Sequence, residues 1–292
     1  MATLQTTVTA LARELGISRA ALYYRPKKPI DDAVVKTKII TVMADHPAYG
    51  SRRVALAIGV NRKKTKRLMR LHGLRPRLRR GFRLVKPNDQ NRPETRIVNI
   101  LQQLCPLVQH IVWAGDFTYL WYQNRFWYVA TVIDVHTREI VGWHIANHHT
   151  TNLIIRAFQD AVRRTAATPA YFHSDQGSEY VSGAYAGVLV SAAVIPSHSR
   201  KSSPWHNGFQ ESFYNNFKLE LGDPGRFAEV GELIEAIHQQ IIYYNTRRIH
   251  TALKMPPVTF REKQQQKKTA LAVVASPVFT HPLFLGEMRM GV

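Results

Sequence analysis

Three acidic side chains stand where the sequence predicts regular secondary structure, and together they could hold a divalent cation. Asp116 lies within Val112–Leu120, whose apolar and aromatic residues are typical of a strand. Asp175 directly follows the short apolar run Ala170–His173, and Glu211 lies in a stretch whose apolar residues recur at helical spacing. Hard divalent cations take oxygen ligands and pair with phosphate groups, so convergence of these carboxylates would favour chemistry on a phosphate ester.

The elements that must position these carboxylates form a mixed α/β pattern. Strands are expected at Ile111–Tyr122, Phe126–Val135, Glu139–Ala146, Ala170–His173 and Ile195–Ser199. Helices are expected over Thr150–Arg164, over Ala184–Val194 and around Glu211. The first three strands follow one another at hairpin spacing, which suggests an antiparallel meander, and the later strands alternate with helices.

The charge balance favours a polyanionic partner. Lys and Arg total 40 against 20 Asp and Glu, and the resulting net charge of +20 suits nucleic acid better than a small substrate. An acidic membrane surface is the alternative, but the sequence shows no basic amphipathic helix, lipidation signal or apolar run long enough to span a bilayer. Residues 1–12 carry no apolar signal core, so we expect a cytoplasmic protein that associates with the nucleoid through DNA. The single cysteine, Cys105, excludes an internal disulfide and a multi-cysteine zinc site.

Two segments of the first 78 residues contain helix-ending and helix-starting residues in the order typical of helix-turn-helix modules. In Val8–Tyr24, Gly16 breaks one helix and Ser18 can cap the next, although an ordinary helical hairpin is the alternative interpretation. Ser51–Arg70 repeats the arrangement of helix, glycine and capped helix. The second helix of this segment is dense in cations and has few acidic neighbours, which favours phosphate contact over a merely solvated face.

The stretch Arg75–Pro93 is rich in arginine and proline, and little of it can be buried. We expect a basic linker that follows a phosphate backbone, with a flexible solvated connector as the alternative. Further candidate DNA contacts lie just before Glu211 and, at Lys218, two helical turns after it. The candidate DNA-binding residues are Arg52, Arg53, Arg62, Lys63, Lys66, Arg67, Arg70, Arg77, Arg79, Arg80, Arg200, Lys201, Asn207 and Lys218.

Several motifs along the chain together carry a family resemblance. They are His46–Gly50 with Arg52 and Arg53, Arg67–Met69, Trp113–Tyr119, Val132–Asp134, His173–Tyr180, Asn207–Phe213 and Tyr243–His250. In these motifs the chain resembles the DDE transposases of bacterial insertion sequences, which have a retroviral-integrase-type catalytic core. More narrowly, it is similar to the second-reading-frame product of insertion sequences that encode their transposase in two overlapping frames.

The resemblance implies an α/β fold with two kinds of domain. The catalytic domain would be ribonuclease H-like, a mixed five-stranded sheet with flanking helices, preceded by all-α helix-turn-helix DNA-binding modules. We expect an N-terminal helix-turn-helix at residues 1–30, a second, basic one at 31–78, a basic linker at 79–98, the catalytic core at 99–262 and a C-terminal tail at 263–292.

The resemblance also implies that Asp116, Asp175 and Glu211 are the catalytic residues and bind two Mg²⁺ ions, with Mn²⁺ as a substitute. One ion would activate water or the 3′-hydroxyl of the element's end, and the other would stabilise the leaving 3′-oxygen in an in-line displacement. The implied partners are double-stranded DNA of the terminal inverted repeats and of the target, further copies of the chain in a dimer or larger assembly on DNA, and an upstream-frame helix-turn-helix product.

Residues close to this triad are expected to have structural roles. Asp134 lies in a strand as Asp116 does, but the family motif gives it no metal, so we expect it to fix the following turn or to pair with a nearby cation. Glu179 is too close to Asp175 in the sequence to be the third ligand of the family pattern. His173 is expected to order the loop of Asp175 by hydrogen bonds. Two alternative functions stay open: a repressor or domesticated DNA-binding protein, and a ribonuclease H-like nuclease that hydrolyses DNA without joining it.

Overall fold

The computed structural model describes residues 7–23, 28–77, 97, 99–100, 106, 108–199 and 208–275. The chain divides into two compact units, Met1–Leu78 and Arg79–Val292. The described part of the first unit is helical, and the second unit contains the sheet. Among the helices of the described residues, none is long and apolar enough to cross a membrane. Of the linker predicted at residues 79–98, the structure describes residue 97 alone, and the predicted domain limits stay predictions.

Three helices form the core of the first unit. They are α3 (Lys28–Asp45), α4 (Ser51–Ile58) and α5 (Arg62–Leu71). Gly59 ends α4 with a φ of 66°, a left-handed conformation that glycine adopts without strain, and the Asn61 side chain caps α5 by accepting from the Lys63 amide at 2.8 Å. The predicted order of helix, glycine and capped helix is confirmed.

A smaller helical hairpin precedes these helices. Its helices are α1 (Val8–Glu14) and α2 (Arg19–Leu22). Gly16 separates them with a φ of 65°, and the Ser18 hydroxyl caps α2 by accepting from the Ala21 amide at 3.2 Å. The punctuation predicted from the sequence is therefore present, and the two leucines at positions 11 and 15 are exposed on its surface.

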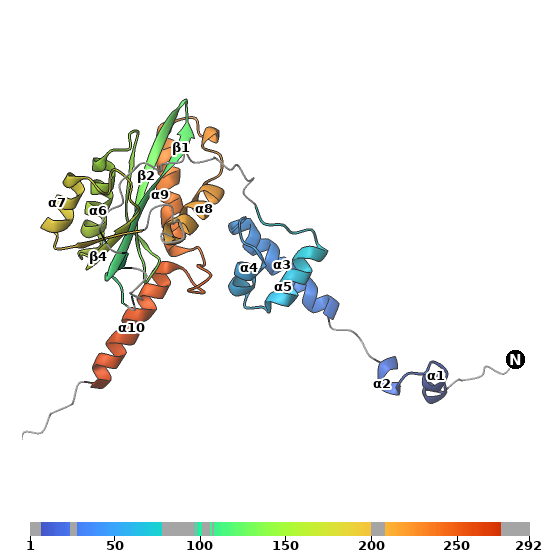
Figure 1. Ribbon diagram of the computed structural model, residues 1–292. Helices are drawn as coiled ribbons and strands as arrows, with labels where there is room; N and C mark the ends of the chain where they lie inside the picture. Colours follow the sequence, from blue (N-terminus) through green and yellow to red (C-terminus); the bar gives the residue numbers. More distant parts are fainter. Residues whose placement is uncertain are drawn as a thin grey trace, which may run out of the picture. The chain divides into compact units, whose positions relative to one another are not determined.

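The sheet of the second unit is mixed (Figure 1). Its strands are β1 (Val112–Tyr122), β2 (Arg125–Asp134), β3 (Ile140–Ala146), β4 (Tyr171–Ser174) and β5 (Ile195–His198), in the spatial order β3-β2-β1-β4-β5. The first three strands pair antiparallel, as the predicted meander requires, and β4 is parallel to both β1 and β5. The two-residue turn between β1 and β2 has positive φ at both Gln123 and Asn124, which matches the right-handed twist of a hairpin.

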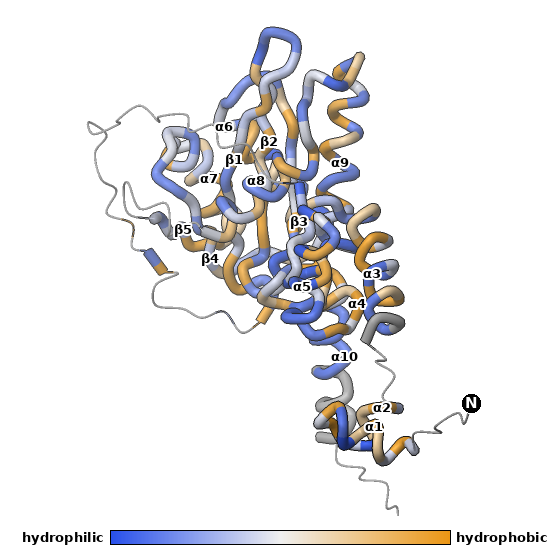
Figure 2. Tube along the Cα trace, turned by 90° about the vertical axis from the view of Figure 1, so that its right-hand side faces the viewer, coloured by the Kyte–Doolittle hydropathy of each residue, from blue (hydrophilic) through white to orange (hydrophobic). Residues whose placement is uncertain are grey.

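Two pairs of helices cover the two faces of this sheet, as Figure 1 shows. The pair α6 (Thr151–Thr165) and α7 (Gly183–Ser191) packs on one face, and the pair α8 (Gly208–Leu221) and α9 (Val230–Thr246) packs on the other. A short 3₁₀ turn, η3 (Pro224–Arg226), joins α8 to α9. Each face therefore has its own apolar core, and the hydrophobic segments of the strands and of α9 stand out in Figure 2.

Close packing, a left-handed residue and a predicted domain limit bear on α6, α7 and α10 (Pro257–Ala275) respectively. A Cβ added to Gly142 of β3 would lie 2.4 Å from the Ala161 nitrogen and 2.5 Å from the Ala157 oxygen, so α6 and β3 pack backbone to backbone and require glycine. Helix α7 ends at Ser191, earlier than predicted, because Ala193 turns into the left-handed region with a φ of 55°. The last helix, α10, runs across the domain limit predicted at residue 262.

Candidate active site

Asp116 lies in β1, and Asp175 directly follows β4, the strand next to β1 in the sheet. The parallel ladder pairs Val112 with Tyr171 and Ala114 with His173. Continued along both chains, the same register brings Asp175, the residue after β4, opposite Asp116. The ladder itself ends at Ala114 and His173, so Asp116 and Asp175 each follow its last pair by two residues.

The charges of both carboxylates affect the pKa of the Tyr180 phenol. Tyr180 is buried, and its pKa is raised well above the ordinary value, first by burial and next by charges that include those of Asp116 and Asp175. Gly115 makes room for this arrangement, because a Cβ at that position would lie 2.4 Å from the ring of Phe172 and 3.2 Å from the Tyr180 hydroxyl. Small size at position 115 therefore allows β1 to pack against both rings.

Two polar side chains on one face of α8 hold this helix against β1 and β2. The fully buried Gln210 amide donates to the Ala114 carbonyl at 2.7 Å and to the Thr131 carbonyl at 3.1 Å, and it accepts from the Thr131 hydroxyl at 3.0 Å. One turn later the Tyr214 hydroxyl donates to the Asp116 carbonyl at 2.6 Å. These contacts set the position of the first turn of α8 against β1 and β2.

Glu211 belongs to that first turn and follows Gln210 directly. Its side chain is exposed, as is that of Asp175, and Asp116 is half-buried. Within the part of the chain that the structure describes, no three His, Cys, Asp or Glu side chains form a group that could hold a metal ion. Asp116 and Asp175 both influence the pKa of Tyr180, and Glu211 lies in α8, but the structure does not gather the three carboxylates into such a group.

The two strand carboxylates fit a hard cation by their chemistry. The Phe117 amide donates to Asp116 Oδ1 at 2.8 Å, and the Gly177 amide donates to Asp175 Oδ1 at 3.0 Å, so the backbone orients each carboxylate. Both are reached by solvent and supply only oxygen, the donor that Mg²⁺ and Mn²⁺ prefer.

The residues at the end of β4 make two kinds of polar contact. The Ser174 hydroxyl donates to the Asp175 carbonyl at 3.0 Å, whereas His173 Nδ1 lies 2.9 Å from the Ser197 hydroxyl, so this contact of His173 joins β4 to β5 and does not order the loop of Asp175. Glu179 pairs with His149 at 2.9 Å. Burial acts to raise the Glu179 pKa, but the hydrogen bond with His149 and further hydrogen bonds outweigh it, and the pKa is lowered.

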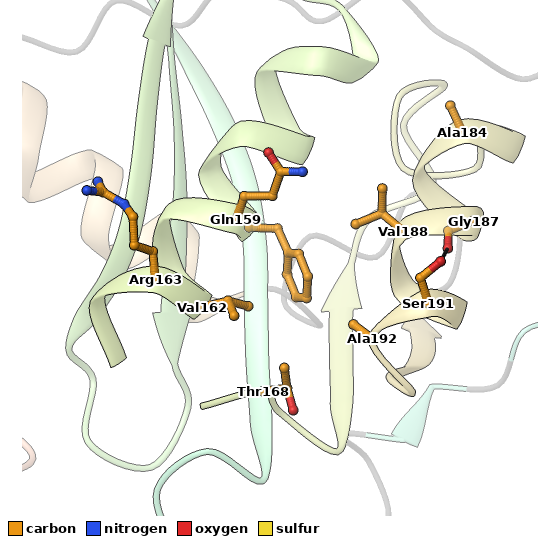
Figure 3. Close-up of a pocket in the computed structure, with 10 residues that line it drawn as sticks. Gln159, Val162, Arg163, Thr168, Ala184, Gly187, Val188, Ser191 and Ala192 are labelled. Atoms are coloured by element: carbon orange, nitrogen blue, oxygen red, sulfur yellow. Dashed lines mark hydrogen bonds between the residues drawn. The ribbon is translucent and has the colours of Figure 1, made fainter. Parts of the chain in front are cut away.

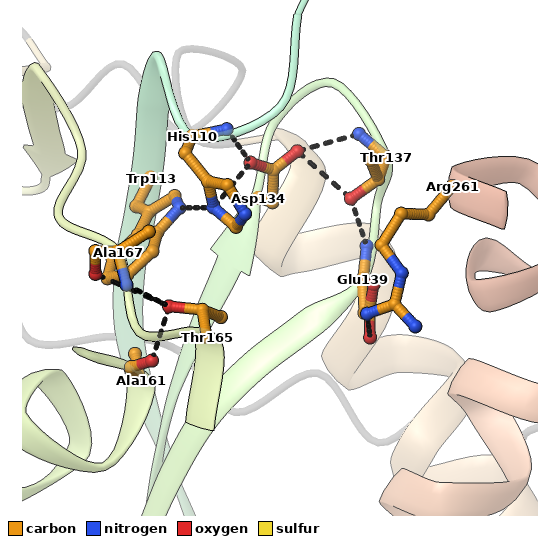
Figure 4. Close-up of polar contacts among 9 residues, drawn as sticks. All are labelled: His110, Trp113, Asp134, Thr137, Glu139, Ala161, Thr165, Ala167 and Arg261. Carbon is orange, nitrogen blue, oxygen red and sulfur yellow. Dashed lines mark hydrogen bonds and ion pairs between the residues drawn. The ribbon is translucent and has the colours of Figure 1, made fainter. Parts of the chain in front are cut away.

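Asp134 fixes the turn between β2 and β3, which confirms its predicted structural role (Figure 4). The side chain is fully buried; its Oδ1 accepts from the Thr137 amide at 2.7 Å and from the Thr137 hydroxyl at 2.9 Å. Its Oδ2 accepts from the His110 amide at 2.7 Å. In the same turn region, Glu139 pairs with Arg261 of α10 at 2.9 Å.

Among the predicted DNA contacts, the cations of α5 lie on its exposed face, opposite the buried Thr65, Leu68 and Met69. Arg67 differs from the other candidates in α5 because its guanidinium forms an ion pair with the Asp32 carboxylate of α3, at 2.6 Å. Arg52 is exposed in α4, and the Arg53 guanidinium lies 5.8 Å from the centroid of the Tyr49 ring. The Arg77 amide donates to the Pro47 carbonyl, and the Lys218 ammonium lies 4.8 Å from the centroid of the Tyr119 ring. Arg79, Arg80, Arg200, Lys201 and Asn207 lie outside the described residues.

Sequence reasoning did not single out Gln210, Thr131, Tyr180 or Tyr214. The spacing of Gln210 and Tyr214, one helical turn apart on either side of Glu211, was a usable signal, because it predicts a polar pair on one face of the helix.

Two cavities lie elsewhere and are not lined by any of the three carboxylates. One, of about 630 Å³, lies between α6 and α7 (Figure 3). The other, of about 400 Å³, is bordered by Glu139, Trp143 and Arg261.

Known proteins share this sequence pattern. A family model described as an integrase core domain matches residues 109–204, and a second model of the same description matches residues 192–257. The chain is 32% identical over 250 residues to the transposase for insertion sequence element IS904 of Lactococcus lactis subsp. lactis, covering 80% of this chain and 95% of the relative. It is 31% identical over 272 residues to the insertion element IS600 uncharacterized 31 kDa protein of Shigella sonnei, covering 88% of this chain and 99% of the relative.

Among solved structures, the chain is similar to the HTLV-2 integrase catalytic core domain in complex with magnesium, with a TM-score of 0.43 and 16% identity over 53% of this chain and 98% of that one. The matched integrase core spans all five strands, and the order β3-β2-β1-β4-β5 is that of a ribonuclease H-like sheet. Because the sequence similarity extends over nearly the whole length of the IS904 relative, the chain belongs to the bacterial insertion-sequence transposases with an integrase core domain.

Proposed function

We propose that this insertion-sequence transposase cuts and joins DNA with Asp116, Asp175 and Glu211 as its metal-binding carboxylates. The register of β1 and β4 is the observation that supports this most strongly, because Asp116 and Asp175 each follow the last pair of that ladder by two residues. Hydrolysis at the ends of the element would be followed by attack of the freed 3′-hydroxyl on target DNA.

Each protein group has a defined part in this proposal. Two bound Mg²⁺ ions, or Mn²⁺, would supply Lewis-acid activation of the attacking hydroxyl and stabilisation of the leaving 3′-oxygen. Asp116 and Asp175 present oxygens that the Phe117 and Gly177 amides orient. Gln210 anchors the helix turn that carries Glu211, so the third carboxylate approaches from the α8 side.

The partners follow from charge and from the reaction. A net charge of +20 and the exposed cations of α5 suit double-stranded DNA, both terminal repeats and target. Two element ends must be brought together for joining, so we expect at least a dimer on DNA. An upstream-frame helix-turn-helix product is the further partner, supplying recognition of the ends.

The test is strand transfer in vitro with Mg²⁺ on labelled DNA that carries the element's own terminal repeats. Wild type is compared with Asp116→Asn and Glu211→Gln, and with Glu235→Gln as a control, because Glu235 is an exposed carboxylate on α9. We expect joined product from wild type and control, and a loss of roughly 100-fold or more in both site variants, as when a preorganised catalytic group is removed.

Other results have definite meanings. Cleavage without joining would favour the hydrolytic nuclease. Equal product from wild type and both site variants would remove the three carboxylates from the mechanism. Tight binding without chemistry in any protein, even after adding the upstream product, would leave only a DNA-binding role.

A further inference from the structure

Five aromatic side chains line one face of the β1–β2 hairpin and form what we call the aromatic strip: Phe117, Tyr119, Trp121, Phe126 and Tyr128. Alternate residues of a strand point to the same face, and the antiparallel register pairs Tyr119 with Tyr128 and Trp121 with Phe126. Three of the rings are unusually open to solvent: Tyr119 is 42% exposed, Trp121 is 55% exposed and Phe126 is 41% exposed.

The rings of the strip contact one another in an unbroken series. Trp121 and Phe126 have centroids 4.7 Å apart, Tyr119 and Phe126 are 5.2 Å apart, and Phe126 and Tyr128 are 6.4 Å apart. Phe117 closes the series at 6.3 Å from Tyr128. Aromatic pairs in such contact hold each other in place, so the strip is a preformed surface.

The strip begins one residue beyond Asp116 in β1. The ring of Phe117 and the side chain of Asp116 point to opposite faces of the strand, and the Phe117 amide donates to the Asp116 carboxylate at 2.8 Å. His149 stacks against Phe117 with an interplanar angle of 10°, and the same imidazole pairs with Glu179 in the loop after Asp175. From there the strip continues along the hairpin, past the last residue of β1 that pairs with β4.

A cation contacts the strip: the Lys218 ammonium lies 4.8 Å from the centroid of the Tyr119 ring. Aromatic faces with adjacent positive charge suit a polyanion that also has flat apolar faces, which is the description of a nucleic acid strand.

We propose that the aromatic strip binds the bases of unpaired, single-stranded DNA next to the scissile phosphate. Bases within a duplex are already stacked on both faces, so only bases outside the helix can use such a surface. A second copy of this chain is a poorer occupant, because each copy carries a net charge of +20 and would bring like charges together. The role rests on the proposed function, since it would hold a frayed DNA end while its phosphate lies at Asp116.

The test measures binding of the full chain to a short single-stranded oligonucleotide of mixed sequence and to a blunt duplex of the same sequence. The variant is Trp121→Ala with Phe126→Ala, and the control is Val190→Ala, an apolar side chain of α7 that is 75% exposed. Tyr119→Leu serves as a second variant that keeps bulk but removes the ring. Circular dichroism checks that each variant is folded.

We expect the double variant to bind the single strand roughly tenfold more weakly, in keeping with the loss of base stacking, with duplex affinity nearly unchanged. The control should behave as wild type, and Tyr119→Leu should show a smaller loss of the same kind. Quenching of tryptophan fluorescence by the single strand should also diminish in a Trp121→Leu variant.

Equal single-strand affinity in wild type, Tyr119→Leu and the double variant would overturn the proposal. So would a change in oligomeric state, seen by sedimentation, without a change in single-strand binding, because the strip would then be a protein interface. Asp116→Asn separates this proposal from the proposed function. It should abolish strand transfer and still bind the single strand normally, so either property can fail without the other.

Discussion

The Tyr214 hydroxyl donates a hydrogen bond of 2.6 Å to the backbone carbonyl of Asp116, so helix α8 is positioned by the same residue that carries a proposed catalytic carboxylate. Burial, and next the charge of Asp116, raise the Tyr214 pKa well above its ordinary value, which keeps the phenol protonated as a donor. The strand and the helix of the site are therefore held together by a contact to the main chain, independent of any ion.

Tyr214→Phe removes this donor and keeps the ring. The Asp116 carbonyl would lose this part-buried hydrogen bond, and the net contribution of such a bond to the free energy of unfolding is about 0.5–1.5 kcal/mol. Urea unfolding measures this cost, and strand transfer should fall further than stability alone explains, because the first turn of α8 loses its position. A variant with wild-type stability and wild-type strand transfer would show that Gln210 alone suffices to hold the helix.

Gly115→Ala tests the close packing beside Asp116. The new methyl would meet the ring of Phe172, which is almost fully buried and has little room to move. Overpacking of this kind costs about 1–3 kcal/mol, and thermal unfolding should show it. The matched control is Gly187→Ala in α7, where an added Cβ meets nothing within 4 Å, and alanine there should leave stability unchanged or raise it by up to about 1 kcal/mol.

Stability should fall on mild acidification. Burial lowers the pKa of His110, His144 and His198 from the ordinary 6.5, against the opposing charge of Asp134 on His110 and of Asp160 on His144. These histidines bind fewer protons when folded than when unfolded, so stability present above pH 6.5 is lost as the pH falls toward their lowered values.

The measurement is the urea midpoint at about pH 7.5 and about pH 5.5, on either side of the range in which histidine titrates. His198→Gln should reduce the difference between the two midpoints, and His148→Gln, at an exposed position, should not. A wild-type midpoint that rises on acidification would contradict the prediction.

The exposed face of α5 should contribute to the salt dependence of duplex binding. If Lys66 and Arg70 each contact a phosphate, Lys66→Ala and Arg70→Ala should each reduce the slope of log affinity against log salt by about 0.9. Arg67→Ala should change the slope less, because Arg67 is engaged with Asp32. Lys38→Ala, an exposed cation of α3, is the comparison. Slopes that do not differ among these variants would place the DNA elsewhere.

Much of the fold could be predicted because its signals are local. Gly59 and Asn61 mark a helix end and a helix start within three residues, and strand alternation identifies β1 and β2 from short windows. The expectation that Asp116 and Asp175 meet came only from the resemblance to a family fold, since no local pattern gives the register between strands so far apart in the sequence.

The contacts that secure the site were harder to predict, for a physical reason. A glutamine in a helix is ordinarily a surface residue, and Gln210 becomes a buried anchor only because Ala114 and Thr131 present carbonyls to it. The pairing of Arg67 with Asp32 likewise depends on how α3 and α5 pack, so sequence alone assigned Arg67 to DNA in the same way as its exposed neighbours.

The parallel ladder between β1 and β4 consists of pairs from Val112–Tyr171 to Ala114–His173, and its strands are separated in the chain by both hairpins of the meander and by α6. Contacts between such distant segments require closure of a long loop and form slowly. A nascent or truncated chain that ends before Tyr171 lacks Asp175, so the proposed pair of carboxylates cannot form in it. If the proposed function is correct, the ability to cut DNA would arise only after β4 and the loop that follows it have been made.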